Sequence, residues 1–358
     1  MAISKVGITQ SETWKEILSQ GQIWQTILLE MSQSASVEKI LATCGKRKEW
    51  IFVGCGSSFY LAEAAANSWT LLTGQRARAL PASEVLLFPQ LVQSQGEEVQ
   101  AVVISRSGKT SETVRAVKVL SHELGVQTIG LTCARDSELE QICDSALVLH
   151  IADEKSMVMT RSFTSMLLSL QYLAGRWAGN TQFIHDLQRM TEHFAPRIHS
   201  LAEVTEEFVE QHSFADYVFL GQGPFHGIAR EASLKVMEMS CSYSQFFHAL
   251  EFRHGPKAIV NQGTCLMFFL SETGFGAERE VLAEMKELGG VTIAVCNQAD
   301  DSLRRASDLV MEVGFDGNQL ALLAPYTVTG QLLGFFTGAR KGLDADHPKN
   351  LSRVVILD

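Results

Sequence analysis

Short apolar runs, each bounded by glycine or polar residues, alternate along the chain with longer stretches of helical periodicity. Because strands that are buried on both faces read as short continuous apolar runs, this alternation predicts an α/β fold with parallel sheets and helices on both faces. The pattern occurs twice, which indicates two doubly wound sheets. The strands, with the loops that follow them, are expected at 50–58, 99–108, 126–133 and 145–151, and again at 217–224, 264–274, 291–296 and 308–313.

The two halves also match each other directly. VQTIGLTCARDSELEQICDSALVL in the first half corresponds to VTIAVCNQADDSLRRASDLVMEV in the second, with strand, turn, short helix and strand in the same order. Such self-similarity is typical of a duplicated fold. We therefore expect a helical N-terminal segment at 1–45, a first α/β domain at 46–180, linking helices at 181–212, a second α/β domain at 213–340 and a C-terminal tail at 341–358.

The stretch ISRSGKTSET follows one of the apolar runs in the first half. Ser105, Ser107 and Thr110 offer hydroxyl donors there, and Arg106 and Lys109 add positive charge. In an open α/β sheet, ligands bind beyond the carboxyl ends of the strands, where the next helix also offers free backbone N–H groups. The loop therefore fits a phosphate monoester.

A second loop of the same kind, GCGSS, follows the preceding predicted strand and places Ser57 and Ser58 at the start of a helix. Serine and threonine favour helix N-caps whatever the function, so one such loop alone would say little. Two loops at one sheet edge favour a phosphate. Neither has the third glycine of a dinucleotide fingerprint or the spacing of a P-loop, so a small phosphorylated metabolite is favoured over NAD or ATP.

The second half lacks the hydroxyl cluster and carries other candidate chemistry. Glu231, Lys235 and Glu238 are spaced to fall on one face of a predicted helix. Such a stripe is most often a solvated helix face. The following loop, EFRHGPKAI, contains His254, and a glutamate with a histidine can supply a base and an acid near neutral pH.

Composition narrows the classes of function. The 358 residues carry a formal net charge of −10, which argues against nucleic acid as a partner. Seven cysteines without a CxxC pair fit a reducing compartment, and we expect a cytoplasmic protein without a metal or other cofactor. We find no signal-peptide pattern and no uninterrupted apolar stretch near the ~18 residues of a membrane span, so no membrane association is expected.

Several motifs together resemble one family. The two glycine-serine loops, AREASLKVMEMS, FRHGPKAIV and DADHPKNLSRVVILD resemble the tandem SIS-domain phosphosugar isomerases, in particular the isomerase half of glucosamine-fructose-6-phosphate aminotransferase. EKSMVMTRSFTSM, RSGKT and FRHGPK are also similar to the related ketose/aldose isomerases and amino-sugar-phosphate deaminases. The resemblance covers nearly the whole chain. It implies two flavodoxin-like SIS domains with bridging helices and a tail that closes the site.

The resemblance also assigns roles to residues. It implies that Glu238 is the base that moves a proton between C1 and C2, that Lys235 lies near the sugar, and that His254 opens the sugar ring from a homodimer partner. Ser57 and Arg353 are possible substrate contacts. The implied ligands of the sugar phosphate are Ser58, Ser105, Arg106, Ser107 and Thr110.

Three departures from the aminotransferase stand out. Arg106 and Lys109 replace its glutamine and glutamate, and Arg353 replaces the tail lysine that forms an imine there. Arginine stays protonated and is a poor nucleophile toward a carbonyl. We see no glutaminase domain or N-terminal cysteine nucleophile in these 358 residues, so we do not expect this chain alone to hydrolyse glutamine.

These departures favour an isomerase/deaminase acting on a 6-phosphorylated ketohexose or hexosamine, such as fructose 6-phosphate or glucosamine 6-phosphate. Two alternatives stay open. One is an aminotransferase that uses free ammonia or ammonia from a partner protein. The other is a phosphosugar-binding regulator without turnover.

Overall fold

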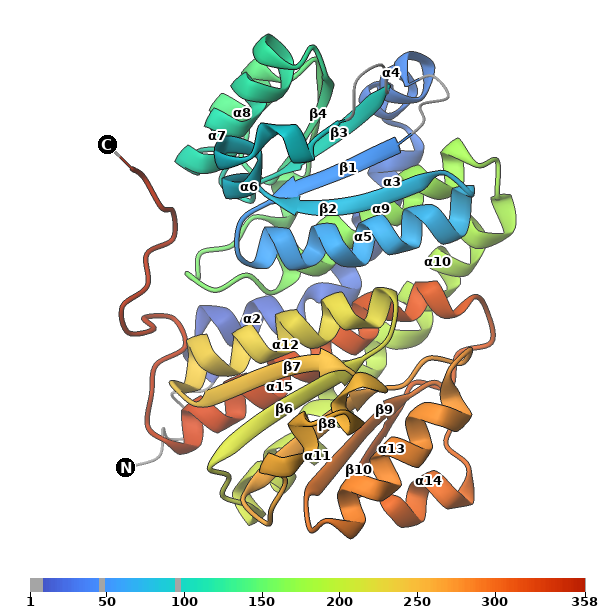
Figure 1. Cartoon of the computed structure of the whole chain (residues 1–358), viewed down its shortest axis with the longest axis vertical. Helices are drawn as coiled ribbons and strands as arrows, with labels where there is room; N and C mark the ends of the chain where they lie inside the picture. Colours follow the sequence, from blue (N-terminus) through green and yellow to red (C-terminus); the bar gives the residue numbers. More distant parts are fainter. Residues whose placement is uncertain (1–8, 45–48, 94–97, 358) are drawn as a thin grey trace. The chain divides into compact units, whose positions relative to one another are not determined.

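The computed structural model describes residues 9–44, 49–93 and 98–357, and Figure 1 shows its elements. The contacts within the chain divide it into two compact units, each built around one parallel sheet. The first-sheet unit comprises Gln22–Glu154, Arg161–Arg189 and Ser352–Asp358. The second-sheet unit comprises Met1–Gly21, Lys155–Thr160 and Met190–Leu351.

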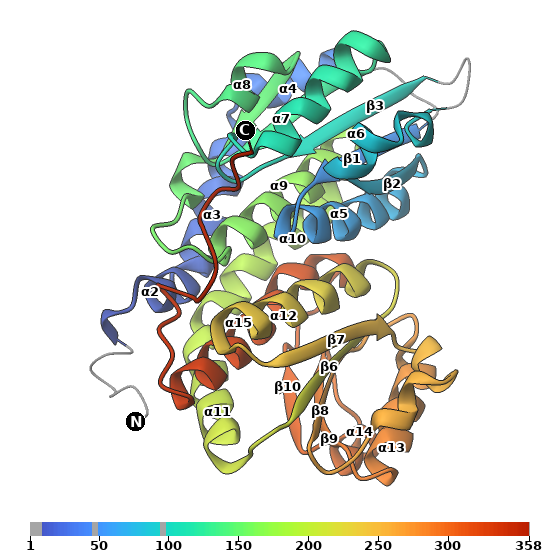
Figure 2. The same ribbon diagram turned by 60° about the vertical axis from the view of Figure 1, so that its left-hand side comes forward.

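The first-sheet unit contains five parallel strands in the order β2-β1-β3-β4-β5. The strands are β1 (Glu49–Gly54), β2 (Arg76–Pro81), β3 (Val99–Ile104), β4 (Gln127–Thr132) and β5 (Ser145–Val148). Helices α5 and α9 pack together on one face, and α6 and α8 pack against α7 on the other (Figures 1 and 2). The helices of this unit are α3 (Gln20–Ser32), α4 (Ala35–Thr43), α5 (Ser57–Thr73), α6 (Ala82–Leu87), α7 (Ser111–Lys118), α8 (Glu138–Ile142) and α9 (Arg161–Trp177).

Burial of both faces explains the apolar runs of the central strands. Ile51 and Val53 on β1 and Val103 on β3 belong to a core cluster with residues of the helices on one face. On the other face, Trp50 lies 4.1 Å from Trp69 of α5 between ring centroids. Every residue of β1 and β3 is buried, as expected for a parallel sheet covered on both sides.

The second-sheet unit repeats this arrangement. Its strand order is β10-β9-β8-β6-β7, so in both units the first strand is internal, the second lies at an edge and the third lies on the other side of the first. The strands are β6 (Asp216–Gly221), β7 (Tyr243–His248), β8 (Thr264–Phe269), β9 (Val291–Cys296) and β10 (Leu309–Glu312). Its main helices are α2 (Glu12–Leu18), α11 (Ile198–Gln211), α12 (Pro224–Ser240), α13 (Phe275–Glu287), α14 (Asp301–Ala306) and α15 (Leu323–Arg340). The two doubly wound sheets expected from the sequence are confirmed.

The shorter elements complete the chain. Helix α10 (Thr181–Phe194) begins in the first-sheet unit. Residues Val119–Glu123 form a π-helical turn at the end of α7. The 3₁₀ turns are at Pro89–Leu91, His150–Ala152, Ala195–Arg197, Glu251–Arg253, Pro256–Ile259 and Gln319–Leu322.

Helix α15 is the apolar centre of the second-sheet unit. The segment Gln319–Arg340 is long and apolar enough to cross a membrane, but its most apolar window is entirely buried inside the protein. It is therefore a core helix. Gly330 and Gly334 let it approach α12 closely, because a Cβ atom at these positions would lie 2.4 Å from the Ala232 Cβ and 2.9 Å from the Lys235 carbonyl carbon.

Candidate functional site

The two polar loops of the first-sheet unit lie at neighbouring strand ends. β1 pairs with β3 on one side and with β2 on the other. The chain therefore reverses its direction of winding between β1 and β3, and such a switch point is where open α/β sheets bind ligands. Ser57 and Ser58 are the first two residues of α5, directly after the turn that follows β1, and the loop at 105–110 leads into α7.

The second of these loops is preorganised by its own hydroxyl groups. Ser105 Oγ accepts a hydrogen bond from the Gly108 N–H at 3.1 Å and lies 3.2 Å from Thr110 Oγ1. Ser107 Oγ accepts from the Lys109 N–H at 3.2 Å. Gly108 has φ +62°, and an added Cβ would lie 2.3 Å from Ser137 Oγ, so a larger residue does not fit. The loop is thus a tight turn that its own hydroxyl groups hold together.

The Arg106 side chain points elsewhere. It is 6% exposed, and its Nη1 lies 3.3 Å from Glu154 Oε2 in a buried ion pair. Its Nη2 donates to the backbone carbonyl of Arg353 at 3.2 Å. The Arg353 guanidinium in turn donates to Asp153 Oδ1 at 2.8 Å. Arg106, which the sequence suggested as a phosphate ligand, therefore contacts a buried carboxylate and the C-terminal segment.

Helix α12 of the second-sheet unit carries the glutamate-lysine stripe. Glu231 and Lys235 are completely buried. Lys235 Nζ lies 3.2 Å from Glu231 Oε1 and 2.5 Å from Glu238 Oε2. A stripe of this kind usually forms a solvated helix face. In α12 it does not, because α15 packs directly over this side of the helix.

Two carboxylates determine the charge of the buried lysine. Burial alone lowers the pKa of Lys235, but the charges and hydrogen bonds of Glu231 and Glu238 outweigh it and leave the pKa raised. The ammonium group is therefore retained at neutral pH. Glu238 is 17% exposed at its side chain, so this member of the group reaches the surface of the unit.

His254 lies on an exposed loop that α13 holds in place. Arg253 and Lys257 flank it and contact the two oxygens of Glu284 at 2.7 and 2.6 Å. Lys257 and Arg253 lower the pKa of Glu284, as expected for a carboxylate between two cations. The His254 N–H donates to the Glu251 carbonyl at 2.9 Å, and the residue is exposed.

The predicted site residues thus form three groups. The loop hydroxyls, Arg106 and Arg353 belong to the first-sheet unit. Lys235 and Glu238 are in contact within the second-sheet unit. Within the described part of the chain, no hydrogen bond or ion pair joins the His254 ring to Glu238 or Lys235.

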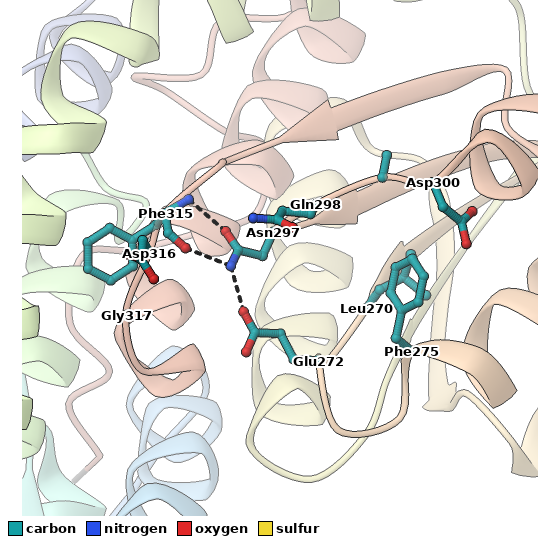
Figure 3. A pocket seen from close by; sticks show the side chains of 10 residues that line it. Leu270, Glu272, Phe275, Asn297, Gln298, Asp300, Phe315, Asp316 and Gly317 are labelled. Carbon is teal, nitrogen blue, oxygen red and sulfur yellow. Dashed lines mark hydrogen bonds between the residues drawn. The ribbon is translucent and has the colours of Figure 1, made fainter.

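A cavity of about 550 Å³ lies elsewhere in the second-sheet unit, at the carboxyl ends of β8 and β9. Figure 3 shows Glu272 and Asn297 turned toward each other at its wall. Asn297 Nδ2 donates to Glu272 Oε1 at 2.5 Å and to the Phe315 carbonyl at 2.8 Å. Asp316 also lines this cavity, while Glu238 and His254 do not. The cavity lies at the ends of the two strands that correspond to β3 and β4 of the first sheet.

The loop beside this cavity has its donors occupied by the protein itself. The Ser271 N–H and hydroxyl donate to the two oxygens of Glu278 at 2.7 and 2.9 Å, and the Glu272 N–H donates to Gln319 Oε1 at 2.9 Å. Burial raises the pKa of Glu278 to about 7, against the two hydrogen bonds from Ser271, which lower it. A carboxylate and an amide oxygen thus accept the hydrogen bonds that this loop can donate. Glu278 was not predicted from the sequence, because it stands in the first turn of α13, where an acidic residue is common whatever its surroundings.

Metal and disulfide chemistry have little support in the described residues. They contain no group of three or more His, Cys, Asp or Glu side chains suited to a metal ion. All seven cysteines are free. Burial raises the pKa of Cys55 in the GCGSS loop, which makes this thiol a poor nucleophile at neutral pH.

Comparisons with known proteins agree with this architecture. The model of the SIS domain family matches residues 45–176 and 194–333. The glutamine–fructose-6-phosphate aminotransferase (isomerizing) of Pyrobaculum aerophilum is 27% identical over 340 residues, which cover 91% of this chain and 54% of that protein. The Chlamydia trachomatis protein of the same name is 24% identical over 360 residues, which cover 96% of this chain and 58% of that protein. The chain therefore spans about half the length of the curated relatives it matches.

Solved structures give the same picture. A glucosamine-6-phosphate deaminase of Thermotoga maritima is 28% identical, with a TM-score of 0.78 and coverage of 97% of this chain and 100% of that one. The tagatose-6-phosphate ketose/aldose isomerase of Escherichia coli has a TM-score of 0.83 at 21% identity, with 98% and 100% covered, and shares the fold. Two SIS domain matches spanning most of the chain, on two sheets of the same strand order, show that this protein belongs to the SIS domain family.

Proposed function

We propose that this chain is an isomerase and deaminase of a 6-phosphorylated ketohexose or hexosamine, of the fructose 6-phosphate or glucosamine 6-phosphate type. The observation that carries the proposal is the buried contact of Lys235 with Glu231 and Glu238 on α12. Burying a lysine and a glutamate completely is costly unless they are paired. A helix whose only need was packing would carry apolar residues at these positions.

The group suits proton transfer between adjacent carbons. In an open-chain amino sugar, the Glu238 carboxylate removes the C2 proton to give an enolamine and then returns a proton to C1. The resulting C2 imine adds water and releases ammonia, which leaves the ketose phosphate. One carboxylate can serve both carbons because it has two oxygens and sits at the surface of its unit. The positive charge that Lys235 retains stabilises the negative charge that develops on a nearby sugar oxygen in the transition state.

The loop hydroxyls support the sugar-phosphate part of the proposal. We assign the phosphate to Ser58, Ser105, Ser107 and Thr110. These residues follow the neighbouring strands β1 and β3, which meet at a switch point of the sheet. A phosphate bound away from the reacting carbons supplies binding energy that positions them.

The tail favours the deaminase over the aminotransferase. Arg353 carries a guanidinium paired with Asp153, and such a group does not form an imine with a ketose. The similarity to a glucosamine-6-phosphate deaminase over nearly the whole of both chains supports the same choice. The names of the curated relatives favour the aminotransferase as the second candidate, with free ammonia or ammonia from a partner protein.

His254 is assigned to ring opening in a homodimer. Its exposure on a loop that is held to α13, away from contacts with Glu238, supports a ring that enters the site of a second copy. The free thiols fit the cytoplasm as the working compartment.

The test is a proton NMR time course of the full chain in deuterated buffer. Glucosamine 6-phosphate is supplied in one sample, and fructose 6-phosphate with ammonium in another. We expect wild type to exchange the C1 or C2 proton with release of ammonia, and Glu238→Gln to be slower by about 10²- to 10⁴-fold. Glu280→Gln, an exposed glutamate of α13, is the matched control and should keep the wild-type rate.

The other outcomes separate the candidates. Ammonium uptake with formation of an amino sugar would select the aminotransferase. Thermal protection by both sugars without exchange would select the regulator. A mixture of Glu238→Gln and His254→Asn proteins tests the dimer, because random pairing restores about a quarter of the wild-type activity if the histidine acts in the partner's site.

A further inference from the structure

The last described residues of the chain, Ser352–Leu357, form a segment that we name the strap. Among the described residues, five hydrogen bonds join it to the rest of the first-sheet unit. Figure 2 shows the strap running along this unit toward α7. It lies beside the loop assigned to the phosphate, because three of the bonds involve Arg106 or Ser111, which belong to that loop and to the first turn of α7.

Polar contacts hold the strap. Ile356 is 74% exposed, and Val355 and Leu357 are also about half exposed. The apolar side chains therefore contribute little burial, although burial is the main stabilising term for most chain segments. A strap held by a few hydrogen bonds at the surface has a stability near the lower end of the range for local structure, so it can open without unfolding the unit.

Arg106 is the most buried of these anchors. Its Nη1 pairs with Glu154, whose side chain is completely buried, and its Nη2 donates to the Arg353 carbonyl. The next residue along, Asp153, accepts from the Arg353 guanidinium. The adjacent carboxylates thus contact two different arginines, Glu154 the Arg106 side chain and Asp153 the Arg353 side chain. Arg106 holds the strap backbone, and Asp153 directs the side chain.

We propose that Arg106 is a positioning residue that holds the strap over the first turn of α7 and orients Arg353, and that it is not a ligand of the phosphate. This rests on the proposed function for the identity of the site and adds its regulation by the strap. The loop keeps Ser105, Ser107 and Thr110 for the anion, while the Arg106 donors face Glu154 and the strap. Breaking the buried pair to reach an anion would leave Glu154 without this cation, which is costly.

The first amide of α7 reports the position of the strap. An N–H group in the first turn of a helix has no partner within the helix. The Ser111 N–H instead donates to the Val355 carbonyl at 3.2 Å, and Ser111 Oγ accepts from the Leu357 N–H at 3.0 Å. If the strap leaves, both amides lose these partners and exchange with solvent.

The experiment measures hydrogen exchange at the Ser111 and Leu357 amides in the full chain, by NMR or mass spectrometry. Wild type is compared with Arg106→Gln and Arg106→Lys. Lys109→Gln is the matched control, because it removes an exposed cation of the same loop. Trypsin cleavage after Arg353 gives a second readout, since proteolysis follows the population of the open segment. Binding of inorganic phosphate is measured on the same samples by ³¹P NMR.

We expect Arg106→Gln to exchange both amides at least tenfold faster and to be cut after Arg353, with phosphate affinity within about twofold of wild type. Arg106→Lys should recover part of the protection, because an ammonium can reach Glu154 or the strap carbonyl but not both in one plane. Lys109→Gln should match wild type in the exchange of both amides and in cleavage after Arg353. Loss of phosphate affinity by tenfold or more in Arg106→Gln with unchanged exchange would overturn the proposal and make Arg106 a phosphate ligand.

Two further arms keep the outcomes separable. If Arg106→Gln does not fold, Ser111→Ala removes one strap contact without touching Glu154, and unchanged trypsin resistance in this variant would contradict the strap's anchoring. In the turnover assay, a positioning role lowers kcat of Arg106→Gln more than it raises KM. Failure of wild type to exchange sugar protons would remove the proposed function and leave the exchange and cleavage results to decide on the strap.

Discussion

The two sheets have the same strand order but use their carboxyl edges in different ways. The turns after β1 and β6 match closely, with φ of 54° at Gly56 and 53° at Gly223. After β3, the loop carries hydroxyl groups of serine and threonine that form hydrogen bonds within the loop itself. After β8, the corresponding loop donates its hydrogen bonds to Glu278 and Gln319. The proposed function assigns the first of these loops to a phosphate, whereas the second has its donors occupied by the protein's own side chains.

The helices after the matching turns differ in the opposite sense. Aligned on the turn glycines, Glu231, Lys235 and Glu238 of α12 correspond to Ala64, Ser68 and Leu71 of α5. Ser68 only donates to the carbonyl of Ala64 at 2.8 Å within its own helix. The two equivalent frames thus carry different polar side chains, with hydroxyl groups in the loop after β3 and a buried lysine between two glutamates on α12.

The largest effect is expected at the buried lysine. Lys235→Met leaves Glu231 and Glu238 without their common cation, and removing one partner of a buried ion pair costs about 3–5 kcal/mol of the free energy of unfolding. Lys286→Met is the matched control, since its pair with Asp308 is partly exposed and is worth about 0–1 kcal/mol. Urea unfolding of both variants measures the difference. If both variants lost the same free energy of unfolding, the buried ion pairs of Lys235 would contribute no more to stability than the partly exposed pair of Lys286.

The next effect depends on pH and belongs to the internal carboxylate. The pKa of Glu278 is raised to about 7 by burial, so the folded protein holds this proton where the unfolded chain has released it. The contribution to stability is therefore complete below the unfolded value near 4.5 and is lost as the pH rises through about 7. This amounts to about 3 kcal/mol.

The measurement compares unfolding free energies at pH 4.5 and pH 8. Wild type should lose about 3 kcal/mol more between these values than Glu278→Gln, which cannot titrate. Glu280→Gln on the same helix is exposed and should retain the wild-type slope. Identical slopes for wild type and Glu278→Gln would show that the second sheet edge does not hold a proton in this way.

The smallest effect distinguishes the two loops directly. Ser105→Ala should weaken the binding of fructose 6-phosphate about tenfold, because a hydrogen bond to a charged group contributes about 1.5–3 kcal/mol. Ser271→Ala should leave this affinity unchanged and lower the unfolding free energy by about 1–3 kcal/mol, since Glu278 loses a buried donor. Calorimetric titration and thermal unfolding of both variants provide the test. Weaker sugar binding in Ser271→Ala would contradict the prediction that only the loop after β3 binds the sugar phosphate.

The internal strands could be read from the sequence, but two edge strands could not. β1 and β3 are buried along their whole length and appear as apolar runs. β2 and β7 are exposed or half-buried at most positions and were not predicted. In β2, Arg78 reaches back to Glu49 of β1 at 3.0 Å. An edge strand packs on fewer neighbours, so its sequence lacks the continuous apolar signal.

The sequence predicted which residues belong to the candidate site, but not whether their side chains are buried. The loops, the glutamates and His254 were found from their spacing and from the family resemblance. The burial of Glu231 and Lys235 was not readable, because it depends on α15, which lies about a hundred residues further along the chain. The signal was present in the four-residue spacing of Gly330, Gly334 and Gly338, which allows close helix packing. A local pattern cannot say which helix such glycines will face.

The burial of Lys235 also makes it a chemical reporter. Acylating reagents modify a lysine only through its neutral amine and only when they can reach it. Lys235 has no exposed surface and a raised pKa, whereas Lys109 and Lys155 are exposed on the same chain. The exposed lysines should be labelled within the first minutes of reaction. Labelling of Lys235 should follow only as α12 separates from α15, so its rate measures how often the centre of the second-sheet unit opens.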